Sequence, residues 1–245
     1  MVLSALVIGS MTPDFAYLMS QLVPRFESHS LRGSIFFCLP VGFATYVIYH
    51  IVLKIPLAAL LPSSLHARAG EQIARSPGLP ARSIPAVLFS LWIGAITHIV
   101  WDQFTHAGSR AVRALPVLST VMFRIHGYPV YLCRLLQHVS TVAGLLAIAL
   151  VLRGVARHPP AEPPPEFVPE RLSGPDRAAR VAALFLLPAV AALALVWEDW
   201  REATNTIEIH TAMYLTAATS LSCLGLALLL YGLAWHALTH HRGPG

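Results

Sequence analysis

Charged residues and cysteines are scarce in this chain of 245 residues. Charged residues make up 12% of the sequence, against about 25% in typical soluble domains, whereas apolar residues make up 56%. A water-soluble globule of this composition would lack the polar surface that it needs to cover its core, so we exclude that class. The three cysteines, Cys38, Cys133 and Cys223, show no CxxC spacing, which argues against a disulfide framework or a zinc finger. The composition therefore predicts a membrane protein.

Five stretches of the sequence contain no Asp, Glu, Lys or Arg and are long enough to cross a membrane. A helix needs about 17 to 25 residues to span a hydrocarbon core of about 30 Å. The five windows are residues 33–53, 83–101, 135–152, 181–197 and 209–241. We therefore predict an all-α, polytopic membrane helix bundle of about five transmembrane helices. Residues 1–9 are apolar but too short to span, and we expect them to form an N-terminal half-helix.

Seven prolines and mixed charges mark residues 154–180 as an extended or disordered linker. This linker predicts a front membrane domain over residues 1–153, with three helices, and a back part over residues 181–241, with two further helices. Polar residues at membrane depth are concentrated in the front domain, so we expect any site to lie there.

The basic residues are spread over the loops and do not cluster, which argues against a nucleic-acid surface. Counted over the five predicted helices, ten basic residues fall on one side of the membrane and seven on the other. Since cytoplasmic loops carry the excess of Lys and Arg, the N-terminal segment and the loop 107–133 are expected to face outward.

One polar stripe runs along the second predicted helix. His98, Asp102 and His106 are spaced i, i+4, i+8, so successive members drift by about 40° around the helix and share one face. This spacing lets an imidazole and a carboxylate reach a single metal ion. The alternative is a His–Asp hydrogen bond that satisfies both groups inside a bundle. An ionisable group at membrane depth is costly, and either interpretation explains why it is present.

Three further polar residues are expected on the same side of the membrane as the end of this helix. Asp14 follows Pro13 at the end of the half-helix, and His29 comes just before the first span. His138 lies a turn or two into the third helix from that side. On the five-helix topology these side chains can converge with His98 and Asp102.

Four separated motifs resemble a known family of bacterial membrane proteins. They are Gly9-Ser10-Met11-Thr12-Pro13-Asp14-Phe15, His29-Ser30-Leu31, the run from Gly94 to His106, and Leu135-Leu136-Gln137-His138. Their order resembles the family called domain of unknown function 4184 and, more distantly, membrane-bound metal-dependent hydrolases of the YdjM type. The resemblance implies that Asp14, His29, His98 and Asp102 are metal ligands and that Thr97 stands where those hydrolases carry a serine. It also implies a multi-pass protein of the bacterial inner (cytoplasmic) membrane.

One departure from this family pattern concerns the start of the chain. Family members usually carry a Pro-Phe-Thr segment and a Ser-His pair ahead of the region where Met1 stands here. Either the true start lies further upstream or this protein is a truncated variant of the family. If that histidine is a ligand, the site as written is incomplete.

These observations lead to one main hypothesis about function. Asp14, His29, His98 and Asp102 would hold a divalent metal ion, and mixed nitrogen and oxygen ligands suit zinc, manganese or iron. The reaction would be a metal-assisted hydrolysis near the membrane surface, with His106 or His138 as the catalytic group that moves a proton. A site at the bilayer edge favours a lipid-like, amphiphilic phosphoester or ester as substrate.

Two other classes of function remain open from the sequence. His98 with His138, and His50 with His236, lie at similar depths and could bind b-type haem, although Asp102 would have no obvious task beside haem iron. The polar stripe could instead be the proton or ion path of a transporter, or a structural feature of a non-catalytic membrane scaffold.

Overall fold

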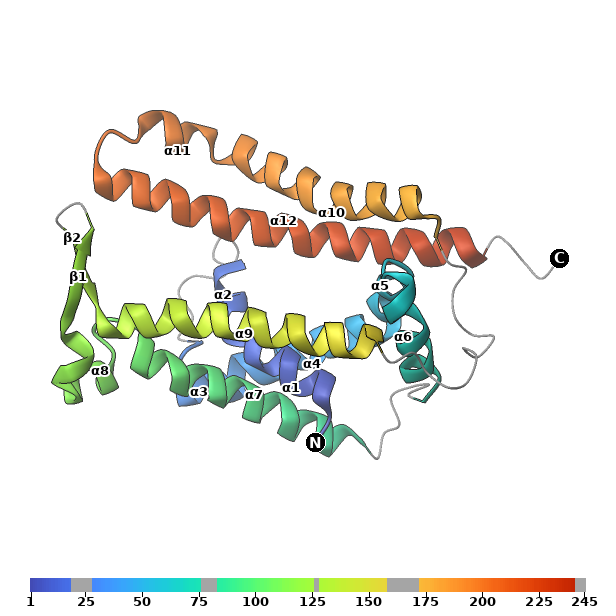
Figure 1. Cartoon of the computed structure of the whole chain (residues 1–245), viewed down its shortest axis with the longest axis horizontal. Coiled ribbons are helices and arrows are strands. Elements are labelled where there is room, and N and C mark those ends of the chain that lie inside the picture. The colour runs from blue at the N-terminus through green and yellow to red at the C-terminus, as the bar shows by residue number, and fades with distance from the viewer. Residues whose placement is uncertain (19–27, 76–82, 126–127, 158–171, 241–245) are drawn as a thin grey trace. The chain divides into compact units, whose positions relative to one another are not determined.

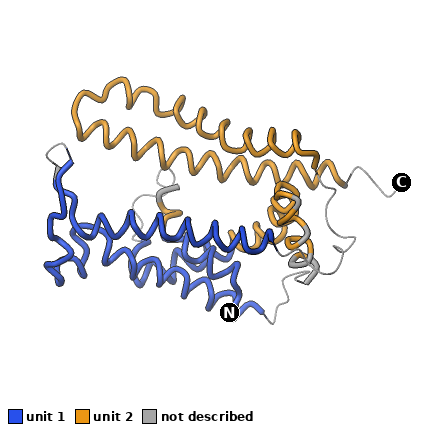
Figure 2. Tube along the Cα trace, viewed as in Figure 1, with its two compact units in different colours: residues 1–13, 27–43, 81–159 blue, residues 14–26, 44–80, 160–245 orange. Residues whose placement is uncertain are grey.

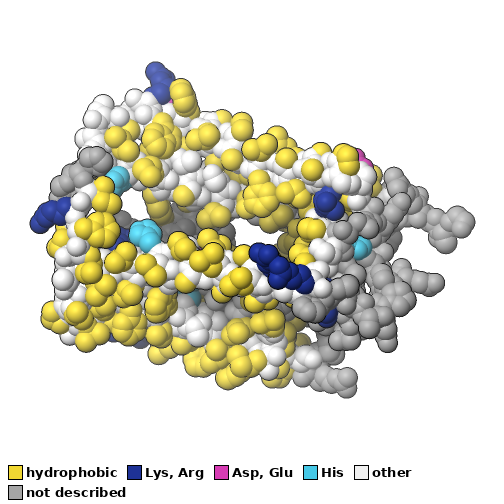
Figure 3. Space-filling view, viewed as in Figure 1, with side chains coloured by type: hydrophobic (Ala, Val, Ile, Leu, Met, Phe, Trp, Pro, Cys, Tyr) yellow, Lys and Arg dark blue, Asp and Glu magenta, His cyan; other side chains and the backbone are white. Residues whose placement is uncertain are grey.

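The computed structural model describes residues 1–18, 28–75, 83–125, 128–157 and 172–240, and nearly all of them are helical (Figure 1). Within these described ranges, five helical stretches are long and apolar enough to cross a membrane: Leu31–Ala59, Ile84–Thr105, Leu132–Arg157, Gly174–Leu195 and Thr206–Thr239. The predicted all-α polytopic membrane fold is therefore confirmed. Apolar side chains cover much of the face shown in Figure 3, as expected for helices in contact with lipid.

The helical spans are longer than the charge-free windows. The third span, α9 (Leu132–Arg157), continues past Arg153, and the fourth, α10 (Gly174–Leu195), begins seven residues before the window 181–197. Ser173 caps α10 by accepting a hydrogen bond from the Asp176 backbone N–H, so this helix starts among charged residues. Residues 158–171, the middle of the predicted linker, lie outside the described part of the chain.

The chain forms two compact units (Figure 2). Unit 1 consists of Met1–Pro13, Glu27–Phe43 and Ala81–Pro159, and unit 2 of Asp14–Phe26, Ala44–Pro80 and Pro160–Gly245. The first span passes from one unit into the other. The sequence-based division at residues 154–180 stays a prediction.

The first span is assembled from five consecutive helical segments. They are α3 (Leu31–Gly33), η2 (Ser34–Cys38), α4 (Leu39–Ile48), η3 (Tyr49–Leu53) and α5 (Lys54–Ala59). Of these, η2 and η3 are π-helical turns, which widen the helix locally. Cys38 and Phe37 are buried at the first of these turns.

In unit 1 the predicted half-helix, α1 (Leu3–Met11), packs along the second span, α7 (Ile84–Thr105). Two glycines allow the two backbones to approach closely. A Cβ atom at Gly9 would overlap the Leu91 backbone, and one at Gly94 would overlap the Leu6 carbonyl oxygen. The Val2 backbone N–H also donates to Ser90 Oγ at 2.8 Å. This small-residue contact fixes α1 on α7 without long side chains between them.

A short extramembrane segment follows α7. It contains α8 (Arg110–Ala114), η5 (Pro116–Ser119) and an antiparallel hairpin of β1 (Val121–Ile125) and β2 (Tyr128–Tyr131). Val112, Leu118 and Cys133 form a small buried cluster that packs this segment against the start of α9. The cluster holds α8 near the C-terminal end of α7, where the polar stripe lies.

Unit 2 is built around an antiparallel pair of long helices. The pair consists of α10 and α12 (Thr206–His240). The shorter helices of this unit include α2 (Phe15–Leu18), α6 (Ser63–Arg75) and α11 (Trp197–Glu202). Trp200 Nε1 donates to Thr216 Oγ1 at 2.8 Å, which ties the turn after α10 to α12. Gly232 brings α12 against the Val52 backbone, and His236 Nε2 lies 3.1 Å from the Val52 carbonyl oxygen.

The close contact of α1 with α7 gives a testable prediction. Gly94→Val would force the new side chain into the Leu6 and Ser10 backbone, so α1 must shift away from α7. We expect the variant to lose about 3 kcal/mol of stability, the upper range for overpacking. The measurement is the midpoint of thermal unfolding in detergent, followed by helical circular dichroism. Gly144→Val on α9 is the matched control, because nothing lies within 4 Å of a Cβ there. Equal midpoints for the two variants would contradict the packing described.

Candidate metal centre

The polar stripe of α7 lies beside two short segments that hold Asp14 and His29. The turn η1 (Thr12–Asp14) continues from α1, and Thr12 Oγ1 donates to the Gly9 carbonyl oxygen at 2.7 Å. Thr12 and Pro13 are fully buried in unit 1, so the turn directly places Asp14, the exposed residue that follows them. The sequence Gly-Ser-Met-Thr-Pro-Asp thus ends α1 and presents a carboxylate.

The position of His29 is determined by its neighbours on both sides. Ser28 is buried, and its carbonyl oxygen accepts a hydrogen bond from Cys38 Sγ at 3.7 Å. Ser30 caps α3 by accepting from the Gly33 backbone N–H at 2.9 Å. His29 Nδ1 lies 3.0 Å from Ser28 Oγ, which leaves Nε2 directed toward α7. The Ser-His-Ser order therefore anchors the histidine between two serines.

Three imidazole rings surround the Asp102 carboxylate. Asp102 Oδ2 lies 3.3 Å from His98 Nε2 and 3.4 Å from His29 Nε2, and Oδ1 lies 3.5 Å from His106 Nδ1. The Asp102 side chain is 18% exposed, and that of His106 is 46% exposed. The cluster therefore extends from a largely buried carboxylate to a histidine that reaches solvent or lipid headgroups.

The main chain of α1 determines which ring nitrogen of His98 carries a proton. His98 Nδ1 lies 2.7 Å from the Ser10 carbonyl oxygen, and a carbonyl can only accept a hydrogen bond, so Nδ1 donates. In the neutral ring Nε2 is then a lone-pair donor to a cation, and it faces the Asp102 carboxylate. Two electron-rich atoms 3.3 Å apart repel unless a positive charge, either a proton or a metal ion, lies between them.

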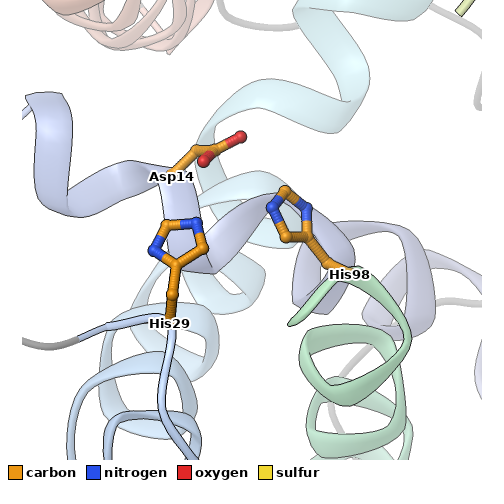
Figure 4. Close-up of side chains that lie close together, drawn as sticks. All are labelled: Asp14, His29 and His98. Carbon is orange, nitrogen blue, oxygen red and sulfur yellow. The ribbon is translucent and has the colours of Figure 1, made fainter. Parts of the chain in front are cut away.

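Two separations in the cluster have the size found between neighbouring ligand atoms of a metal ion. Ligand atoms about 2.1 Å from a tetrahedral zinc ion lie about 3.4 Å from one another. The distances from Asp102 Oδ2 to the two histidine nitrogens, 3.3 and 3.4 Å, match that spacing. Asp14, His29 and His98 also offer one ligand atom each, all within 4.8 Å of one another, and Figure 4 shows the Asp14 carboxylate near the two rings. The same pair of histidines thus has a carboxylate available from either of two directions.

The sequence-predicted residues differ in where they lie. His29, His98, Asp102 and His106 come together around one carboxylate, and Asp14 lies within ligand distance of two of them. His138 is exposed on α9, and it is not among the imidazoles that contact Asp102 in the described residues. Sequence reasoning missed the Ser10 carbonyl, because a main-chain acceptor has no residue-type signal. The Ser28 hydroxyl beside His29 was also missed, although it precedes the histidine directly.

Comparison with known proteins identifies the family but no characterised relative. A family model described as Domain of unknown function (DUF4184) matches residues 1–238. No curated protein and no solved structure matches the chain. Because the match covers nearly the whole sequence, this membrane protein belongs to the DUF4184 family.

Proposed function

We propose that the protein is a membrane-bound, metal-dependent hydrolase that acts at the bilayer surface on an amphiphilic phosphoester or ester. One observation carries the proposal. His98 donates its Nδ1 proton to the Ser10 carbonyl, so that its Nε2 lone pair faces Asp102 Oδ2 and lies in the same cluster as His29 Nε2. A divalent cation would satisfy all three atoms at once.

His29, His98 and Asp102 would hold this ion, with Asp14 as a further oxygen ligand. Mixed imidazole and carboxylate ligands suit zinc, manganese or iron. The bond from His98 to Ser10 is the kind of outer contact that orients a metal-ligating histidine and makes its other nitrogen more basic. The Ser28 hydroxyl, 3.0 Å from His29 Nδ1, would likewise orient the His29 ring.

The chemistry would depend on the ion and on one neighbouring histidine. A bound divalent ion supplies a water of lowered pKa and polarises a phosphoryl or acyl oxygen. His106 is the group that would move the proton, because Asp102 Oδ1 faces its Nδ1 and so orients the ring. The ring is 46% exposed and therefore reachable by a substrate. His138, which does not contact Asp102, is the weaker candidate for this role.

The position of the cluster along the spans supports an amphiphilic substrate. His29 comes two residues before the first span, Asp102 lies in the last turn of the span Ile84–Thr105, and His106 directly follows that span. Helix ends mark the boundary between hydrocarbon and headgroups. A substrate cleaved here would have its polar bond at the surface and its apolar part in the bilayer.

Metal content is the first prediction. We expect the purified full-length protein to hold about one zinc, manganese or iron ion per chain, measured by plasma mass spectrometry. Asp102→Asn and His98→Gln should each lose most of it, and His98→Ala with Asp102→Ala all of it, because the ion loses a ligand. His210→Gln on α12 removes an exposed imidazole elsewhere and should keep the ion. A wild-type protein without stoichiometric metal would refute the hydrolase proposal.

The role of His106 gives a second prediction. His106→Gln should retain metal but slow hydrolysis of a phospholipid substrate by about 100-fold, the typical loss when a general acid–base group is removed. The assay is phosphate or headgroup release from mixed micelles, with His210→Gln as the control. An undiminished rate in His106→Gln, together with a loss in His138→Gln, would transfer the proton-moving role to His138.

One observation supports a different function. His106, His98 and His29 each lie 3.3 to 3.5 Å from an oxygen of the Asp102 carboxylate, so Asp102 links the three imidazoles. Such a linked group in a membrane protein also suits the proton path of a coupled transporter. Proton flux into proteoliposomes that stops in Asp102→Asn, in a protein without metal, would favour this alternative. A haem protein would be recognised by its visible absorption.

A further inference from the structure

A basic groove lies directly beside the candidate metal centre in unit 1. It has a volume of about 880 Å³ and is formed by the start of the first span, the last turns of α7 and the short helix α8. His29, one of the proposed ligands, lines its wall. Pockets of about 300 to 1,000 Å³ are typical of small-molecule sites. The groove therefore offers room for a ligand that reaches the metal centre from one side.

The charge of the groove selects the ligand. Arg32, Arg110 and Arg113 line it, and none of the described residues that line it is acidic. These three arginines form no ion pair with any other residue that the structure describes. A guanidinium is always charged and its planar donors match two oxygens of a phosphate. Three such groups without a carboxylate partner favour a phosphate-bearing ligand.

A second, apolar groove continues from the first along α7. It has a volume of about 380 Å³ and is lined by Ile96, Thr97, Val100, Trp101 and Phe104. Val100 and Phe104 line both grooves, so the two are contiguous. Trp101 is 46% exposed and Phe104 37%, although both are large apolar side chains. This face of α7 is therefore suited to contact with a hydrocarbon chain.

The depth of the two grooves matches an amphiphile. The arginines lie at the membrane ends of the first span and of α7, where headgroups are found. Ile96 precedes the end of α7 at Thr105 by nine residues, or about 13 Å at 1.5 Å per residue, which is within the hydrocarbon region. The polar groove is thus at headgroup level, and the apolar groove is at acyl-chain level.

We infer that unit 1 binds an anionic phospholipid-type amphiphile, with its phosphate on Arg32, Arg110 and Arg113 and one acyl chain along Val100, Trp101 and Phe104. The inference rests on the proposed function for its role, since the bound phosphate lies beside His29 and so defines the substrate class of the metal centre. The binding itself does not require the metal.

The test therefore measures binding by the full-length protein in non-ionic detergent after treatment with EDTA. The probes are dioctanoyl phosphatidic acid, dioctanoyl phosphatidylcholine and glycerol 3-phosphate, titrated by isothermal calorimetry. We expect phosphatidic acid to bind at least tenfold more tightly than either of the others. Equal affinity for phosphatidylcholine would refute the arginine site, and equal affinity for glycerol 3-phosphate would refute the acyl groove.

Variants separate the two parts of the site. Arg110→Gln with Arg113→Gln should weaken phosphatidic acid binding by tenfold or more, and unchanged affinity would overturn the inference. Trp101→Ala with Phe104→Ala should weaken the binding of phosphatidic acid but leave the binding of glycerol 3-phosphate unchanged. Arg134→Gln on α9 removes an exposed arginine outside the groove and should bind normally. All the substituted side chains are exposed, and circular dichroism would verify the fold of each variant.

Metal content, measured in parallel, keeps this inference separate from the proposed function. If the protein holds no metal but binds phosphatidic acid through its arginines, the inference of a lipid-binding groove is supported and the hydrolase proposal is refuted. If the protein holds metal and its arginine variants bind phosphatidic acid as tightly as the wild type, the proposed metal centre is supported and the inference of a lipid-binding groove is refuted.

Discussion

The close approach of α1 to α7 is the contact on which the polar cluster depends. Gly9 and Gly94 leave no side chain between the two backbones, so the end of α1 lies directly against the middle of α7. As a result the Ser10 carbonyl reaches His98 Nδ1, and the following turn holds Asp14 near the two histidines. Packing of two apolar helices thus decides the tautomer of a polar residue. A larger residue at either glycine would move the carbonyl and the carboxylate together.

The low charge content of the chain places a second constraint on the cluster. In a hydrocarbon environment each polar group needs a partner, because water does not compensate for a missing hydrogen bond. The hydroxyls in unit 1 accordingly bond to main-chain carbonyls or cap helices, as Thr12, Ser30 and Ser90 do. The Asp102 carboxylate, with three imidazoles and no arginine or lysine partner among the described residues, is the exception. At that exception a positive charge, either a protonated imidazole or a bound ion, would compensate the carboxylate.

Much of the fold could be predicted because the membrane imposes a simple rule on composition. Windows without charge located all five spans, and the i, i+4 spacing placed His98, Asp102 and His106 on one face. The ends of the spans were harder, since Ser173 and Asp176 start α10 with charged residues that the windows exclude. The β1–β2 hairpin was also missed: its exposed strand carries Val121, Phe123 and Ile125 without the inside–outside alternation of a half-buried strand. The groove lined by His29 and Arg110 depends on α8, whose position follows from the small cluster around Cys133 and from hydrogen bonds of Ser109 and Arg110 to Gln103, neither of which has a charge or periodicity signal.

The two carboxylates of the candidate centre are not equivalent. Asp102 is on a long helix, 18% exposed, and its two oxygens are already divided: Oδ2 faces His29 and His98, and Oδ1 faces His106. Asp14 is exposed on a short turn, and one of its oxygens lies within 4.8 Å of a ligand atom of each of the same histidines. A single ion at His29 and His98 would therefore take Asp102 Oδ2 with little rearrangement, while Oδ1 would continue to orient His106. Asp14 would then complete the coordination from the open side, and a substrate phosphate arriving from the basic groove would approach beside His29. On the proposed function a single ion is the simpler arrangement, with Asp102 joining the metal to His106, because two ions would have to share His29 and His98 among the described residues.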